Sequence, residues 1–411
     1  MWPRKRFDIR LTDIATGIFY CLKPFPAAQA RERLEKFWAP DGDGLAFLSV
    51  RSGFDALWEA LGLPEGSEVL ITAVNIPHMA EIIRFHRLVP VPVDLDLERM
   101  APLEDLLPKL QSEKTRAIVV AHLFGGQVRM EPILRWAKEN GLLVIEDCAQ
   151  AYSGLHYRGH PEADVSMFSF GSIKTATALG GALFRIRNPQ LAARMRAVEE
   201  RWPVQSRLKY LQRLLKYAWF SVVCRPVPFA LFVSTCRLMG YDYDQIIHSA
   251  VRGFPGSDWR EKIRHRACAP LLLLLLRRLK RYDMARLAQR AAKGEMLLDL
   301  LSQHVFCPGA KAENRTHWVF PILVDDPVAV TSRLQQAGFD AARTHSLTVI
   351  EAPPNHPASP PLAESKRLLQ QLVCLPIYPE IPDRAIRRMA NVVLEAYRPT
   401  PLFIPKTHPV G

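Results

Sequence analysis

The chain has 411 residues and a formal net charge of +13; 48% of its residues are hydrophobic and 23% are charged. A chain of this size and composition can bury a large core and is expected to form two or more structural units. Its seven cysteines lack CxxC spacing and its histidines lack ligand spacings such as HExxH. These patterns argue against a disulfide framework and against a metal site, and they favour a reducing cytoplasm as the location.

In chain order, residues 1–40 are expected to form an N-terminal arm with a helix near AQARERLEKFW. Charges interrupt each apolar stretch at this end, so no cleaved signal peptide is expected. Residues 41–200 alternate strand-like and helix-like segments, which predicts a large doubly wound domain with a mostly parallel sheet. In residues 294–398, strand-like HWVFPILV and helix-like VAVTSRLQQAG and PDRAIRRMANVVLEAY predict a smaller C-terminal α/β domain. Residues 399–411 are rich in proline and are expected to be irregular.

Residues 201–293 form a basic and apolar segment, expected to be a helical insertion between the domains. It contains 19 Lys and Arg against 5 Asp and Glu, a local net charge of +14 that accounts for the excess of the whole chain. Three interpretations compete: a dimer interface, a site for the diphosphate of a nucleotide-sugar, and a peripheral membrane contact through 211–239 at the inner face of the membrane. No helix-turn-helix, zinc finger or RNA-binding signature accompanies the charge, so no nucleic-acid partner is expected.

Two residues in the large domain point to a specific chemistry. Asp147 ends the apolar run GLLVIED, which reads as a buried parallel strand whose carboxyl end lies at a ligand site. Lys174 follows 27 residues later, after the strand-like DVSMFSF and before two glycines. A lysine that holds pyridoxal 5'-phosphate (PLP) as a Schiff base needs an anion beside the pyridine nitrogen, and Asp147 can supply it. The alternative is a loop lysine and a surface aspartate without a shared role.

An ordered set of motifs resembles one family, the DegT/DnrJ/EryC1/StrS sugar aminotransferases of the fold-type I PLP-dependent enzymes. The matching segments are LSVRSGFDALWEALGL, PVPVDLDLERM, TRAIVVAHLFGGQVRM, VIEDCAQAYSG and MFSFGSIKTATALGGALF, with weaker similarity in the C-terminal third. The resemblance implies a large doubly wound domain, a smaller C-terminal α/β domain and a homodimer with shared active sites.

The resemblance also implies roles for single residues. Lys174 matches the lysine that holds PLP, Asp147 its pyridinium partner, Gln150 a glutamine that contacts the cofactor, and Ser169 a phosphate ligand. Gly53 and Phe54 match a turn whose backbone N–H groups bind phosphate at the start of a helix, a position with unsatisfied donors and a positive dipole end.

The chain departs from the family pattern at several positions. Phe54 replaces a threonine, so a hydroxyl ligand to the phosphate is lost. Ile76 occupies the position of a ring-stacking aromatic residue; His78 is the candidate replacement, with a structural histidine as the alternative. Lys262 aligns with an asparagine that reaches the phosphate from the partner subunit. His122 is expected either to shape the cofactor pocket or to be a hydrogen-bonded core residue.

The function implied by the resemblance is transfer of an amino group from an amino acid, glutamate in many relatives, to a keto-sugar that is nucleotide-linked or lipid-linked. Lys174 would move the proton between substrate and cofactor. The alternative is a catalytically altered PLP-binding protein with a regulatory or membrane-surface role.

Overall fold

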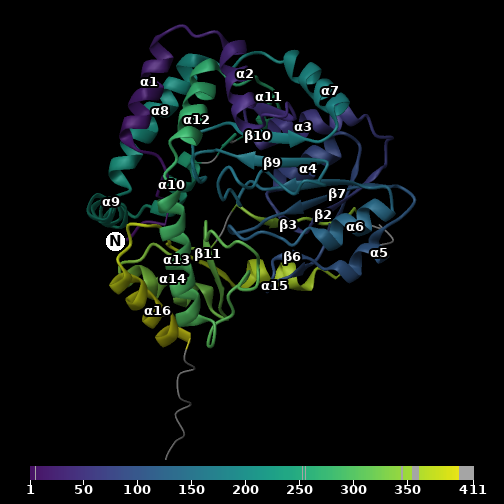
Figure 1. Cartoon of the computed structure of the whole chain (residues 1–411). Coiled ribbons are helices and arrows are strands. Elements are labelled where there is room, and N and C mark those ends of the chain that lie inside the picture. Colours follow the sequence, from purple (N-terminus) through teal and green to yellow (C-terminus); the bar gives the residue numbers. More distant parts are fainter. Residues whose placement is uncertain (5, 252, 255, 344–345, 354–360, 398–411) are drawn as a thin grey trace, which may run out of the picture.

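The computed structural model of the chain describes residues 1–4, 6–251, 253–254, 256–343, 346–353 and 361–397. A large twisted sheet lies on one side of the molecule, a group of helices stands along its edge, and the C-terminal elements lie beneath both (Figure 1). The predicted tail at 399–411 lies outside the described residues.

The large sheet has seven strands in the order β1-β10-β9-β8-β7-β2-β4. The β9-β8-β7-β2-β4 part is parallel, and β10 and β1 are added antiparallel at one edge. The strands are β1 (Gly44–Phe47), β2 (Glu68–Thr72), β4 (Val89–Val93), β7 (Thr115–Ala121), β8 (Leu143–Asp147), β9 (Val165–Ser169) and β10 (Ala182–Ile186). The predicted mostly parallel sheet is confirmed.

Helices cover both faces of this sheet. Successive residues of its strands therefore point into two different hydrophobic cores, one on each face. Val69 and Ile71 pack with α3 (Val50–Leu61), α4 (Pro77–Phe85) and α7 (Pro189–Glu200), whereas Leu70 packs on the other face with α5 (Leu107–Leu110) and α6 (Glu131–Glu139). Strands buried on both faces read as nearly continuous apolar runs, which is why GLLVIED could be recognised as a strand.

The N-terminal residues form a packed layer instead of the predicted arm. The predicted helix is present as α2 (Ala27–Trp38), and a further helix, α1 (Leu11–Leu22), was not predicted. Both helices pack on α12 (Ala269–Lys280), and α1 also packs on α8 (Arg207–Val223) (Figure 1). Ile14, Leu34 and Trp38 are buried in the same core as Leu271, so this segment belongs to the body of the large domain.

The 201–293 segment is helical, as predicted, and one helix runs across its predicted boundary at residue 293. It contains α8, α9 (Pro226–Leu238), α10 (Tyr243–Val251), α11 (Trp259–Ile263), α12 and the start of α13 (Met284–Leu301), which continues past residue 293. The leucine run of α12 is buried beside the sheet. Among the described residues no single helix is long and apolar enough to span a membrane; α8 and α9 meet that requirement only together, across a bend of 95°.

The C-terminal unit is small and mixed, as predicted. Strands β11 (Phe320–Leu323) and β13 (Leu372–Leu375) pair antiparallel, and α14 (Pro327–Gln336), α15 (Ala363–Gln371) and α16 (Asp383–Tyr397) surround them. Short ladders complete the chain: β3 (Val74–Asn75) with β12 (Thr348–Val349), and β5 (Leu95–Asp96) with β6 (Ala101–Pro102), the latter followed by the short helix η1 (Glu104–Leu106).

Candidate active site

A cavity of about 650 Å³ opens where two parallel strands end. Asp147 is the last residue of β8 and Ser169 the last residue of β9, and both line this cavity together with Lys174 and Gln150. Open α/β sheets bind ligands at the carboxyl ends of their strands. The structure therefore brings four of the sequence-predicted site residues to one place.

Lys174 lies on a tightly held loop between β9 and β10. The Thr177 hydroxyl donates to the carbonyl oxygens of Phe170 (3.0 Å) and Gly171 (2.6 Å), and Ala176 N–H donates to Asp8 Oδ2 at 2.8 Å. Ala176 and Leu179 both adopt left-handed backbone conformations, with φ of 54° and 62°. Such strained positions persist only where the surroundings hold them, so the lysine is fixed by its loop.

The ammonium group of Lys174 is buried and lies 4.0 Å from the centre of the Trp318 ring. The Trp318 indole N–H in turn donates to the carbonyl oxygen of Ile173 at 2.9 Å. Burial lowers the pKa of Lys174 to about 8, although the charge of Asp147 opposes this shift; the charge of Arg51 adds to it. The lowered pKa increases the fraction of neutral amine near physiological pH, and the neutral form is the one that acts as a nucleophile.

Asp147 is also buried, and its carboxylate accepts a hydrogen bond from Ala149 N–H at 3.0 Å. Burial raises its pKa, and the Ala149 hydrogen bond and the positive charge of Lys174 oppose that rise. A carboxylate in this setting gains strongly from a cationic partner, because a buried charge is costly when unpaired. A protonated ring nitrogen is such a partner.

The helix whose start was predicted to bind the phosphate begins earlier in the chain than Gly53. Helix α3 starts at Val50, with Ser49 as its N-cap, and Ser49, Val50 and Arg51 line the cavity. Gly53 does not line it: its N–H donates to the Ser49 carbonyl oxygen, and a Cβ placed there would lie 2.3 Å from the Phe184 ring. Gly53 and Phe54 thus lie outside the cavity, and the N–H donors at the helix start belong to Val50 and Arg51.

Packing explains why α3 departs from the family pattern at two positions. The Phe54 ring is fully buried and meets Trp58 edge-on, 5.2 Å between centres. Asp55 accepts hydrogen bonds from His86 Nε2 (2.9 Å) and Arg264 Nε (2.8 Å). Burial would raise the pKa of Asp55, but these two partners outweigh it and lower the pKa. Both side chains serve the structure of the helix.

The remaining predicted residues fall into two groups. Gln150 lines the cavity and accepts a hydrogen bond from Phe124 N–H at 2.9 Å. His78 and Ile76 also line it, and the His78 ring packs on Trp259 at 4.5 Å. Lys262 lies outside the cavity on α11, where its ammonium pairs with Asp258 at 2.7 Å. That Lys262 reaches the cofactor phosphate of a partner subunit remains a prediction.

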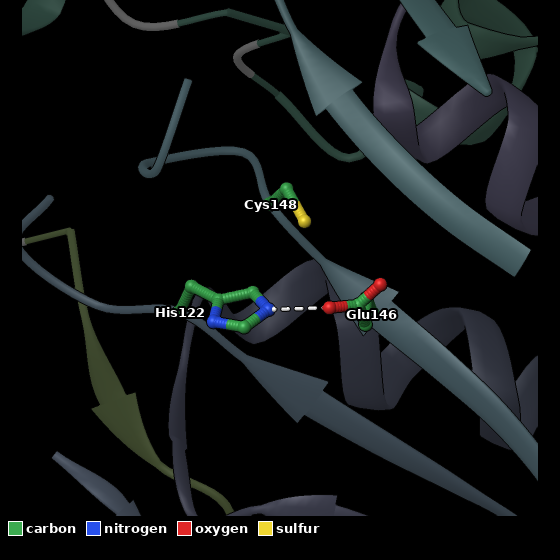
Figure 2. Close-up of side chains that lie close together, drawn as sticks. All are labelled: His122, Glu146 and Cys148. Atoms are coloured by element: carbon green, nitrogen blue, oxygen red, sulfur yellow. Dashed lines mark hydrogen bonds and ion pairs between the residues drawn. The ribbon is translucent and has the colours of Figure 1, made fainter. Parts of the chain in front are cut away.

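His122 is a hydrogen-bonded core residue and does not line the cavity. It lies with Glu146 and Cys148 in a buried group of three side chains of the kind that bind metals (Figure 2). His122 Nδ1 accepts the Val128 N–H at 2.8 Å, so Nε2 carries the proton and donates to Glu146 at 3.1 Å. Glu146 also accepts from Tyr157, His160 N–H and Ser166. No lone pair of this imidazole is left for a metal ion.

The cavity is strongly cationic, a property that the sequence suggested only as one of three interpretations of the 201–293 segment. Nine cationic side chains line it against four acidic ones; the cations include Arg51, Arg213, Lys216 and Arg290. The Arg213 guanidinium donates to the Leu179 carbonyl oxygen at 3.2 Å, and Arg290 donates to Thr175 Oγ1 at 3.2 Å. The local charge of the 201–293 segment was a signal for Arg213, Lys216 and Arg290, but it did not indicate which cations face inward.

Comparison with solved structures finds the same fold in two known aminotransferases. The aminotransferase TlmJ from Streptoalloteichus hindustanus superposes with a TM-score of 0.70 over 96% of this chain and 98% of that one, at 17% identity. PseC from Helicobacter pylori, an aminotransferase involved in the biosynthesis of pseudoaminic acid, gives a TM-score of 0.68 over 97% and 98%, at 15% identity. The fold is thus the fold-type I α/β fold expected from the sequence.

Sequence comparison is more specific for the part of the chain that carries the site. Residues 32–213 match the DegT/DnrJ/EryC1/StrS aminotransferase family, so the segment that carries the site is similar to that family. GDP-perosamine synthase from Escherichia coli O157:H7 is 37% identical over 128 residues, which cover 30% of this chain and 35% of the relative. UDP-4-amino-4-deoxy-L-arabinose–oxoglutarate aminotransferase from Shewanella sediminis is 29% identical over 153 residues, 37% and 39% of the two chains. The matches span little more than a third of these curated relatives.

Proposed function

We propose that the protein is a PLP-dependent aminotransferase that moves an amino group from glutamate to a keto-sugar. The observation that carries this proposal is the pairing, at one cavity, of a buried lysine with a pKa of about 8 and a buried carboxylate. These are the two groups that a pyridoxal cofactor requires from a protein. Both are present, which favours a working transferase over a non-catalytic PLP-binding protein.

The residues at the cavity fit PLP in chemistry and in size. Lys174 supplies the amine for covalent attachment, and Asp147 supplies the anion for the ring nitrogen. The start of α3 at Ser49 and Val50 and the Ser169 hydroxyl offer hydrogen bonds to a phosphate. The cavity of about 650 Å³ lies within the range of cofactor and substrate sites. When bound, PLP supplies an electron sink for the carbon that loses its proton.

The chain's own groups would perform the proton movements. Lys174, as a neutral amine, would accept a proton from the amino donor and pass it to the bound cofactor. Asp147 would stay ionised beside a cationic ring and stabilise it throughout. The loop contacts of Thr177 and Ala176 hold the lysine in place, so little reorganisation is needed.

A nucleotide-linked keto-sugar is the acceptor class that the site favours. Arg213 and Lys216 line the cavity, and the cationic excess there suits a diphosphate. The names of the two relatives above, a GDP-perosamine synthase and a UDP-sugar aminotransferase with oxoglutarate, agree with this acceptor and with glutamate as the donor.

A cytoplasmic homodimer with shared active sites is part of the same proposal. The family pattern places a partner residue near the cofactor phosphate, and Lys262 is the matching residue here. Its position outside the chain's own cavity, with its side chain partly exposed, is compatible with reaching a neighbouring subunit.

Borohydride reduction tests the proposed function. After incubation with PLP and reduction, we expect a pyridoxyl group on the peptide that contains Lys174, and loss of both the label and the visible absorbance in Lys174→Ala. Lys311→Ala is the control, because Lys311 is exposed and pairs with Glu98 far from the cavity. A pyridoxyl label retained in Lys174→Ala, with an unchanged visible spectrum, would exclude the proposal. Glutamate should convert the bound cofactor to its amino form without an acceptor.

A further inference from the structure

Three neighbouring helices expose most of the large apolar side chains on the described surface. Of nineteen such residues, twelve lie on α1, α8 and α9 or just after α9. Isolated exposed apolar residues are ordinary, but a concentrated patch marks an interaction surface. We call this surface the apolar face; it consists of Leu11, Phe19, Leu22, Leu208, Leu215, Trp219, Val222, Val227, Leu231, Leu238, Met239 and Tyr241.

The helices that carry the apolar face pack side by side. Helix α8 contacts both α1 and α9, and the three lie together at one edge of the molecule (Figure 1). The opposite sides of these helices are in the core: Tyr210 and Leu214 of α8 and Phe229 of α9 are buried. Each helix therefore lies flat on the protein with one apolar side inward and another outward. This arrangement suits a membrane interface and not a membrane span.

Cations predominate around the apolar face, and the exposed Asp242 and Asp283 lie at its margins. Residues 203–241 contain six Arg and Lys, and no Asp or Glu. The one acidic residue of α1, Asp13, is buried and paired with Arg277 and Arg278. Arg207 donates to the carbonyl oxygens of Cys21 and Lys23, so it lies between α1 and α8. The face thus combines apolar side chains with cations.

This charge pattern distinguishes between two partners that could cover the apolar face, a second copy of the chain and a membrane surface. A second copy meeting the same face across a two-fold axis would place mostly cations against one another, with few acidic partners. The surface of an anionic bilayer offers both an apolar boundary and phosphate groups. We propose that the face formed by α1, α8 and α9 docks on an anionic membrane surface.

Docking through this face would bring the active-site cavity to the headgroup layer. The inner side of α8 contributes Gln212, Arg213, Lys216 and Tyr217 to the cavity, while its outer side carries Leu215 and Trp219. Helix α8 thus has the active-site cavity on its inner side and the apolar face on its outer side. The proposal extends the membrane contact expected at 211–239 to α1, and it stands independently of the amino-transfer chemistry.

Vesicle flotation of the purified full-length protein tests this proposal. We expect binding to phosphatidylcholine vesicles that contain phosphatidylglycerol, little binding to phosphatidylcholine alone, and weakening by salt. Trp219→Glu and Leu231→Glu should each lower the bound fraction about tenfold or more, because an inserted apolar side chain is lost. Val328→Glu is the matched control: Val328 on α14 is as exposed as Leu231, at 64% and 65%, but lies outside the apolar face.

A charge-reversed variant covers the case in which an apolar substitution disturbs folding. Lys209→Glu combined with Arg237→Glu changes two exposed cations that line neither the cavity nor the core, and it should abolish binding to anionic vesicles at an unchanged melting temperature. Vesicle binding that does not depend on lipid charge, or that is unchanged in these variants, overturns the proposal. A second outcome would also overturn it: the wild type binds no vesicles, and sedimentation velocity shows a dimer that Leu231→Glu converts to monomer. In that case a second copy of the chain covers the apolar face.

Discussion

At the scale of single residues, the cavity controls whether the Lys174 amine carries a proton. Burial lowers its pKa to about 8, and the charge of Asp147 partly opposes that effect. Below this pH the ammonium form dominates and cannot act as a nucleophile; above it the neutral amine dominates. Reactivity of this lysine should therefore rise with pH through a midpoint near 8.

Brief acetylation of the cofactor-free protein measures this midpoint by mass spectrometry of the peptide containing Lys174. In Asp147→Asn the negative charge that favours the ammonium form is removed, so we expect the midpoint to move to lower pH. A midpoint that stays in place, or moves upward, would show that Asp147 does not act on Lys174. The same variant should lose amino transfer by about a hundredfold or more, the scale on which removal of one electrostatic stabiliser acts.

At the scale of elements, the start of α3 depends on close packing against β10. Gly53 allows this contact, since a Cβ there would lie 2.3 Å from the Phe184 ring. Gly53→Ala should therefore destabilise the protein by about 1–3 kcal/mol, the usual cost of overpacking a core. Thermal melting measures the effect. Adding Phe184→Leu removes the ring atoms concerned and should restore part of the loss; an unchanged melting temperature for Gly53→Ala alone would refute the packing argument.

The same elements show what the sequence could and could not predict. Asp147 and Ser169 were placed correctly because each ends a buried strand, and parallel strands end at one edge of a sheet. The start of α3 was misplaced because Ser52-Gly53 resembles a turn, whereas Ser49 caps the helix and Gly53 is needed for packing. Trp318 was missed because it meets Lys174 only through the fold, 144 residues later in the chain.

At the scale of the whole molecule, buried ion pairs connect the N-terminal layer to the loop that carries Lys174. Arg278 on α12 pairs with Asp13 on α1 at 2.8 Å and donates to the Thr177 carbonyl oxygen at 3.0 Å. Arg277 pairs with the same carboxylate at 3.0 Å. The Asp13 carboxylate thus joins α1 to α12, and Arg278 extends the network to the loop at Thr177. This network explains why the N-terminal residues are part of the large domain and not a detachable arm.

Removing that carboxylate should destabilise the molecule strongly, because Arg278 is left buried without its anion. For Asp13→Ala we expect a loss of about 3 kcal/mol or more in the free energy of unfolding, within the range for breaking a buried pair. Urea unfolding measures it. Glu65→Ala breaks the exposed pair with Arg87 and should cost less than about 1 kcal/mol.

The network also gives Asp13→Ala an effect on the site that ordinary destabilisation would not produce. Because Thr177 and Ala176 hold the loop of Lys174, loosening Arg278 should weaken PLP retention during dialysis under conditions where the variant remains fully folded. Replacing both partners, Asp13→Leu with Arg278→Met, should recover stability, since an apolar pair leaves no buried charge. It should not recover PLP retention, because methionine cannot donate to the Thr177 carbonyl. If stability and retention recover together, the ion pair supports only the core and does not position the lysine.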